Sequence, residues 1–177
     1  MVYSLVCNLT SLDLVVFIHE RDYTCHILWD MLMSKTPLLI SLTFRMQQHA
    51  SIDPEVESFE FGLLVASTAA WSLQHLRLDG VFIRARPFAA FLKTQASSLT
   101  DLMITYPHKR TKLRAMLLAM KHHSLSKLKT FNVTIGYWVD GRWEPEIMSV
   151  DCLAYIRRET DENLIMSPWY AETEYET

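Results

Sequence analysis

A short pattern of alternating apolar and polar positions returns five times along the chain of 177 residues. Each copy reads Leu-x-x-Leu-x-Leu or a close variant, and the copies begin at Leu9, Leu39, Leu73, Leu99 and Leu128. Apolar residues at every second position predict a strand that buries one face. The copies follow one another after 26 to 34 residues. A period in this range predicts stacked supersecondary units, each contributing one strand.

Segments in which apolar residues have helical spacing separate these strands. We expect helices over 22–35, over 53–71, from about 87, from about 111, and from about 149 to 158. In the third and fourth helices, the residues expected to face the core are Phe88, Phe91, Leu92, Leu113, Met116, Leu117 and Met120. Strands that alternate with helices predict a parallel sheet joined by crossover connections.

The alternation of strands and helices stops after the fifth strand, where Asp140-Gly141 lies between Trp138 and Trp143. An Asp-Gly pair between aromatic and β-branched residues predicts a β-hairpin, because this pair tolerates the positive φ angles of a tight turn. Two interpretations remain. The hairpin is either an aromatic binding ridge or a cap on the last unit. We favour the cap, because a stack of repeats needs its last edge covered.

Composition allows a packed core, since half of the residues are hydrophobic. The net charge of −3 gives no reason to expect nucleic acid as a partner. Residues 159–177 carry six acidic and no basic residues, which predicts a flexible acidic tail. We therefore expect three parts: a repeat array over 1–136, a hairpin and helix cap over 137–160, and the tail over 161–177.

The cysteines and the hydropathy bear on location. Cys7, Cys25 and Cys152 are odd in number and far apart, which predicts free thiols in a reducing compartment, the cytoplasm or the nucleus. No apolar run reaches the roughly 18 residues that a membrane span needs. We expect no signal peptide and no membrane association.

The chain lacks the motifs of common active sites. Its four glycines do not form either of the usual phosphate-binding motifs, G-x-x-x-x-G-K and G-x-G-x-x-G. His108, His122 and His123 have no Cys or carboxylate partners at metal-ligand spacing. We expect a non-catalytic protein without a metal or cofactor. An enzyme with a site assembled from loops is a less favoured alternative.

If the leucines of each strand point inward, the residues between them form an outward face. The residues expected to bind a partner on this face are Asp13, Thr43, Arg45, His75, Arg77, Asp79, Asp101, Met103 and Asn132. The same rule exposes Thr105 and Thr134. These side chains are chemically mixed, with no basic stripe and no aromatic platform for nucleic acid. The face is either a surface for binding a polypeptide or an ordinary solvated sheet surface.

The segments 73–81 (LQHLRLDGV) and 88–104 (FAAFLKTQASSLTDLMI) resemble leucine-rich-repeat proteins. More narrowly, the chain is similar to the irregular repeats that follow the F-box in fungal F-box proteins. The resemblance implies an α/β solenoid of about five irregular repeats, with a curved parallel sheet on the concave side, helices on the convex side and a hairpin and helix cap at the C-terminal end. It implies a protein partner, as in substrate recognition by a ubiquitin ligase.

Two departures from this family limit what the resemblance implies. The positions where repeats usually place Asn or Cys hold Phe17, Gln47, Val81, Pro107 and Gly136, so we expect no asparagine ladder. Only eight residues precede the first unit, and they do not resemble an F-box. A ligase adaptor would need an N-terminal F-box that is missing here. A truncated or vestigial fragment without a specific partner is therefore the alternative expectation.

Overall fold

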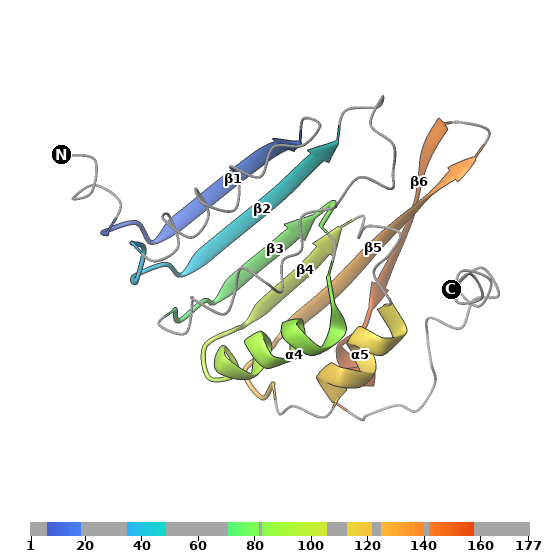
Figure 1. Ribbon diagram of the computed structural model, residues 1–177. Helices are drawn as coiled ribbons and strands as arrows, with labels where there is room; N and C mark the ends of the chain where they lie inside the picture. The colour runs from blue at the N-terminus through green and yellow to red at the C-terminus, as the bar shows by residue number, and fades with distance from the viewer. Residues whose placement is uncertain are drawn as a thin grey trace.

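The computed structural model describes residues 7–18, 35–48, 71–81, 83–105, 113–121, 125–139 and 142–157. These residues form an α/β structure around one six-stranded sheet, in which the strands follow their order in the chain (Figure 1). The strands are β1 (Ser11–Ile18), β2 (Ser41–Gln48), β3 (His75–Asp79), β4 (Asp101–Thr105), β5 (Thr130–Val139) and β6 (Arg142–Asp151). The helices are α4 (Ala85–Thr94), α5 (Leu113–Lys121) and α6 (Leu153–Ile156). The helices expected over 22–35 and 53–71 lie mostly outside the described residues.

The first five strands are parallel and pair in one common register. A single row crosses all five strands and is formed by Leu12, Leu42, Leu76, Leu102 and Phe131. Each of these residues is the second apolar position of its sequence copy. The prediction of one parallel strand per unit, aligned by the repeated pattern, is therefore confirmed for all five copies.

A repeated backbone contact brings each new strand into this register. At the start of β2, the amides of Ile40 and Ser41 both donate to the carbonyl oxygen of Thr10, over 2.8 and 3.0 Å. The same double contact recurs at three further strand entrances, onto the carbonyl oxygens of Ile40, Gln74 and Thr100. At these four entrances, a carbonyl oxygen of the previous unit thus accepts from two backbone donors of the next unit.

The leucine side of the sheet packs against the helices. Figure 1 shows α4 and α5 on one side of the sheet. Phe88, Phe91 and Leu92 of α4 are buried in the same cluster as Leu76 and the other inward residues of the strands. Met116, Leu117 and Met120 of α5 are buried there as well, as the helical spacing predicted. The side chain of Leu113 lies outside the described residues.

A buried glutamine joins α4 to the entrance of β3. Gln95, at the C-terminal end of α4, is fully buried, and its side-chain oxygen accepts a hydrogen bond of 3.0 Å from the Leu73 amide. Its own carbonyl oxygen accepts from the amide of Leu99, which leads into β4. The side chain of Gln95 therefore satisfies a buried donor, and its side chain and backbone carbonyl together hold two strand entrances against one helix end.

The C-terminal hairpin is present, but the last helix is shorter than expected. β5 and β6 are antiparallel, and Val139 pairs with Arg142, so two residues connect them. The expected start of the helix near 149 is wrong, because β6 continues to Asp151 through pairing with β5. The helix occupies only Leu153–Ile156. β5 also runs through the expected boundary at 136, and the division into three parts stays a prediction.

Gly80 makes the turn after β3 possible. Its φ angle is +69°, in the left-handed region that glycine adopts without steric cost. A Cβ atom at this position would lie 2.5 Å from the backbone carbonyl oxygen of Met46. The Gly80 amide meanwhile donates to the carbonyl oxygen of Thr105, over 2.9 Å. The turn therefore needs both a positive φ and the absence of a side chain.

We predict that Gly80→Ala lowers the free energy of unfolding by at least about 1 kcal/mol, from the left-handed backbone alone. The contact with Met46 adds to this loss. Gly80→Asn separates the two causes, because asparagine tolerates positive φ better but still carries a Cβ. Urea unfolding of both variants is the measurement. Wild-type stability in Gly80→Ala would contradict this account of the turn.

The inward and outward assignment predicts opposite behaviour for two adjacent residues of β3. Leu76 is buried, so Leu76→Asp places an unpaired charge in the core and should cost several kcal/mol, roughly the 3–5 kcal/mol of an uncompensated buried charge. Arg77 lies on the other face and is partly exposed, so Arg77→Glu should cost much less than Leu76→Asp, about 1 kcal/mol at most for the loss of its ion pair with Asp79. Chemical denaturation of both variants tests this. Equal losses would mean that the assignment of faces is wrong.

Candidate functional site

The sheet surface opposite the leucines carries all nine residues that were expected to bind a partner. The structure places Asp13, Thr43, Arg77, Met103 and Asn132 in one register row, His75 and Asp101 in the row before it, and Arg45 and Asp79 in the row after it. Each is at least partly exposed. We call this surface the polar face and define it by these nine residues together with Ser41, Thr105, Thr130 and Thr134.

Two positions of the polar face differ from expectation. Thr105 and Thr134 were expected to be exposed, but they are 6% and 7% exposed. Both have short side chains with a neighbouring strand on each side, since Thr105 lies between Asp79 and Thr134, and Thr134 pairs with Ser149 of β6. At this end of the polar face, the side chains of β4 and β5 are therefore buried rather than exposed. The Thr105 hydroxyl has no hydrogen-bond partner there.

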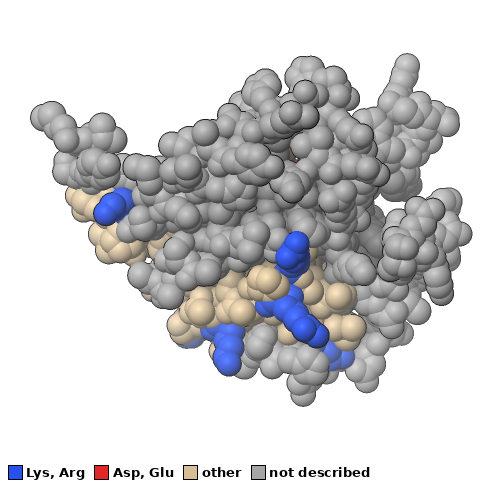
Figure 2. Space-filling model, viewed as in Figure 1, with Lys and Arg blue, Asp and Glu red and all other residues tan. Residues whose placement is uncertain are grey.

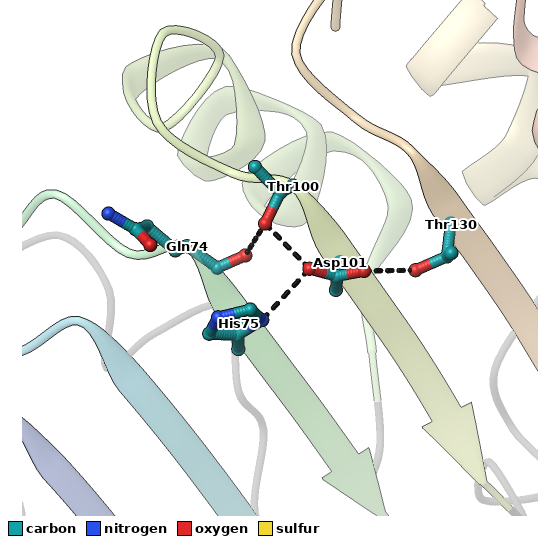
Figure 3. A network of polar contacts seen from close by, with 5 residues as sticks. All are labelled: Gln74, His75, Thr100, Asp101 and Thr130. Carbon is teal, nitrogen blue, oxygen red and sulfur yellow. Dashed lines mark hydrogen bonds and ion pairs between the residues drawn. The ribbon is translucent and has the colours of Figure 1, made fainter.

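Asp101 is the centre of a hydrogen-bond network across three strands (Figure 3). The hydroxyl of Thr130 donates to its Oδ1 and that of Thr100 contacts its Oδ2, both over 2.6 Å. His75 Nδ1 lies 2.9 Å from Oδ2. The Thr100 hydroxyl also lies 3.0 Å from the carbonyl oxygen of Gln74. Since a hydroxyl has one proton, Thr100 shares it between these two acceptors.

This network stabilises the ionised form of Asp101. The hydrogen bonds from Thr100 and then Thr130 lower the pKa of the Asp101 carboxyl, burial opposes them, and His75 adds a smaller lowering effect. Asp101 is therefore a carboxylate at neutral pH. Most of its acceptor capacity is already used by residues of its own sheet.

The arginines of the polar face have different partners. Arg45 donates to Asp13 over 2.7 Å, in a close ion pair between β2 and β1. Among the described residues, the ion pair of Arg77 is with Asp79, and the two charged groups are 3.9 Å apart, which is too far for a hydrogen bond. The Nε atoms of both arginines are buried without a hydrogen-bond partner.

Asp79 is the more buried of the two aspartates near the middle of the sheet. Its side chain is 26% exposed, compared with 39% for Asp101. Burial raises the pKa of the Asp79 carboxyl, and the charges of Arg77 and Arg45 oppose this only in part. The same face thus holds one carboxylate stabilised by hydrogen bonds and another destabilised by loss of water.

A hollow of about 230 Å³ opens over the middle of the polar face. It crosses β2, β3, β4 and β5, so residues far apart in the chain contribute to it. Its polar lining consists of Ser41, Thr43, His75, Arg77, Asp101, Thr130 and Asn132, with Met103 as an apolar member. The hollow offers hydrogen-bond donors, acceptors and both signs of charge within one space.

One row has the residue order of a charge-relay system. Ser41, His75 and Asp101 are neighbours on β2, β3 and β4, and Asp101 contacts the ring nitrogen of His75. The hydrogen bonds among the described residues include none between Ser41 and His75. Asp101 also receives two threonine hydroxyls, whereas a catalytic aspartate is typically buried behind its histidine. The described contacts of this row therefore differ from those of a hydrogen-bonded Ser-His-Asp relay.

The sequence did not indicate this network. Thr100 lies just before β4, outside the alternating pattern, and its role depends on the register that puts it beside Gln74 and Asp101. A hydroxyl next to an aspartate at a strand entrance was the only signal available. Within the described ranges, no group of three His, Cys, Asp or Glu residues could hold a metal ion. No helix in those ranges is long and apolar enough to cross a membrane.

Comparisons with models of protein families, with curated proteins and with solved structures found no match to this chain.

The two aspartates predict opposite pH effects on stability. Because the folded pKa of Asp101 is lowered, its contribution is present above the unfolded value near 3.9 and is lost as pH falls through the folded pKa. Because the folded pKa of Asp79 is raised, its contribution is present below that unfolded value and is lost as pH rises through the folded pKa.

We therefore expect Asp101→Asn to be less stable than wild type at pH 7, by up to about 1 kcal/mol because the group is exposed, and to lose this difference towards pH 3. Asp79→Asn should gain stability relative to wild type as pH rises over the same interval. Urea unfolding at several pH values measures both differences. Parallel pH profiles for the two variants would refute the assignment.

Proposed function

We propose that the polar face is a protein-binding surface, and that the chain is a leucine-rich-repeat solenoid without catalytic activity. The observation that supports this most is the hollow over β2–β5, where four strands present exposed polar side chains in one register. Such a surface suits an extended polypeptide, because groups from successive strands lie at regular spacing of about 4.8 Å.

The leucine-rich-repeat assignment has two supports. The apolar pattern and the strand pairing share one register through all five copies, and each strand entrance repeats the same double backbone contact onto the preceding unit. By resemblance, the module is the substrate-recognition part of an F-box type ubiquitin-ligase subunit, acting in the cytoplasm or nucleus. Contact with the ligase adaptor would then be made by a separate F-box.

The charges of the polar face favour protein over nucleic acid. Arg45 and Arg77 are accompanied by Asp13, Asp79 and Asp101, so no continuous cationic track is available for phosphates. Five strands span only about 20 Å, and a standard interface buries about 800 Å² on each partner. Binding to these strands alone is therefore weak, and affinity depends on further contacts beyond the polar face.

The test is a comparison of two variants that introduce an arginine on opposite sides of the sheet. Met103→Arg fills the hollow, and Ala90→Arg adds an arginine to the exposed side of α4. Proteins that bind wild type and Ala90→Arg, but are lost with Met103→Arg, should be found by affinity capture and mass spectrometry. We expect at least one such protein.

Two results would count against the proposal. If the captured proteins were the same for all three chains, the polar face would be an ordinary solvated surface of a structural segment. If a fluorophosphonate probe labelled wild type at Ser41 but not a His75→Ala variant, the row of Ser41, His75 and Asp101 would be an active site, and the non-catalytic assignment would be wrong.

A further inference from the structure

The hollow contains one cation whose charge is poorly compensated. Arg77 lies in the central row between Thr43 and Met103, neither of which is charged. Among the described residues, its closest ion pair is with Asp79 and is 3.9 Å long, and its Nε atom has no hydrogen-bond partner there. Arg45 in comparison makes a 2.7 Å pair with Asp13 and does not line the hollow. Arg77 is therefore the arginine with donors available to a bound molecule.

The other charges around the hollow are already engaged. Asp101 accepts hydrogen bonds from two threonine hydroxyls and contacts His75, so it has little capacity left for a cation from a partner. Asp79 faces Arg77 but does not line the hollow. A partner entering the hollow thus finds Arg77 as the main unsatisfied charged group.

We propose that the polar face binds a polypeptide segment that carries one Asp or Glu side chain, which is placed in the hollow on the guanidinium of Arg77. This inference rests on the proposed function and names the chemistry of its partner. The planar guanidinium binds carboxylates through paired N–H donors, and such bonds are among the strongest in protein interfaces. Thr43, Thr130 and Asn132 line the same hollow and can hydrogen-bond the partner's backbone.

A carboxylate fits this hollow better than a phosphate group does. A phosphorylated side chain carries nearly two negative charges and is typically bound by a cluster of arginines. Here a single arginine lines the hollow, and Asp101 lines it as well. One carboxylate matches the one poorly compensated charge, whereas a dianion would be repelled by the two nearby aspartates.

Asp79 competes with the partner for Arg77. It is the only carboxylate that the described contacts place next to this guanidinium, and its own environment disfavours the charged form. Removing its charge should therefore strengthen binding of a segment with one Asp or Glu side chain, while removing the charge of Arg77 should weaken it. Opposite effects from two residues in contact are a specific signature of this site.

The experiment is selection of a random peptide library, displayed on phage, against the full purified chain. We expect peptides enriched in Asp or Glu at one position. Binding of a selected soluble peptide is then measured by fluorescence polarisation. Arg77→Gln should weaken binding roughly 10-fold or more, the effect of losing a charge-assisted hydrogen bond. Asp79→Asn should tighten it, and replacing the acidic residue of the peptide by its amide should weaken it as much as Arg77→Gln does.

Arg86→Gln is the matched control, since it removes one exposed arginine from α4 on the other side of the sheet. It should leave binding unchanged. Selected peptides that lack acidic residues, bind Arg77→Gln equally well and are lost with Met103→Arg would overturn this inference while supporting a protein-binding polar face. A library that yields no peptide dependent on Met103 would count against both.

Discussion

The structure depends on the sharing of one apolar row between neighbouring strands. A single strand of this kind cannot bury its leucines, because each needs side chains of the strands before and after it. Leu42, Leu76 and Leu102 have such neighbours on both sides and are at most 2% exposed, whereas Leu12 on the edge strand β1 is only partly buried. Burial thus increases from the first strand inwards, and the register of every strand is set by its neighbours.

This constraint leaves the opposite face of the sheet largely free of core packing. Since stability comes from the inward leucines and from the double backbone contacts at the strand entrances, the outward side chains can vary at little cost. What they carry is an interleaved set of charges: a close Arg45–Asp13 pair, a looser Arg77–Asp79 pair, and Asp101 held by hydroxyls. Figure 2 shows a different character on the helix side, where the exposed charges of described residues are blue, from Lys and Arg.

The sequence was sufficient to predict the strands, their common register and the hairpin, because period-two burial and the Asp-Gly pair are local signals. The sequence was insufficient where the conformation or exposure of a residue depends on the neighbouring strand. Whether Ser149 continues a strand or begins a helix depends on β5 as a partner, and the exposure of Thr105 depends on its neighbours. Gln95 was missed because its role, a bond to the Leu73 amide, joins segments that no local pattern connects. The Asp101 network and the hollow could not be predicted either, because they depend on which residues the strand register places side by side.

The position of the hollow follows from the same packing argument. It spans β2–β5, the strands that have a paired neighbour on both sides, since β1 lies beyond β2 and β6 pairs along β5. The backbone of a doubly paired strand is already held on both sides, so the proposed binding would order little further backbone and less conformational entropy would oppose it. A site on the edge strand β1 would lack this advantage. Asp101 illustrates it: three residues from neighbouring positions hold its carboxylate, and the hollow beside Arg77 is shaped before any partner arrives.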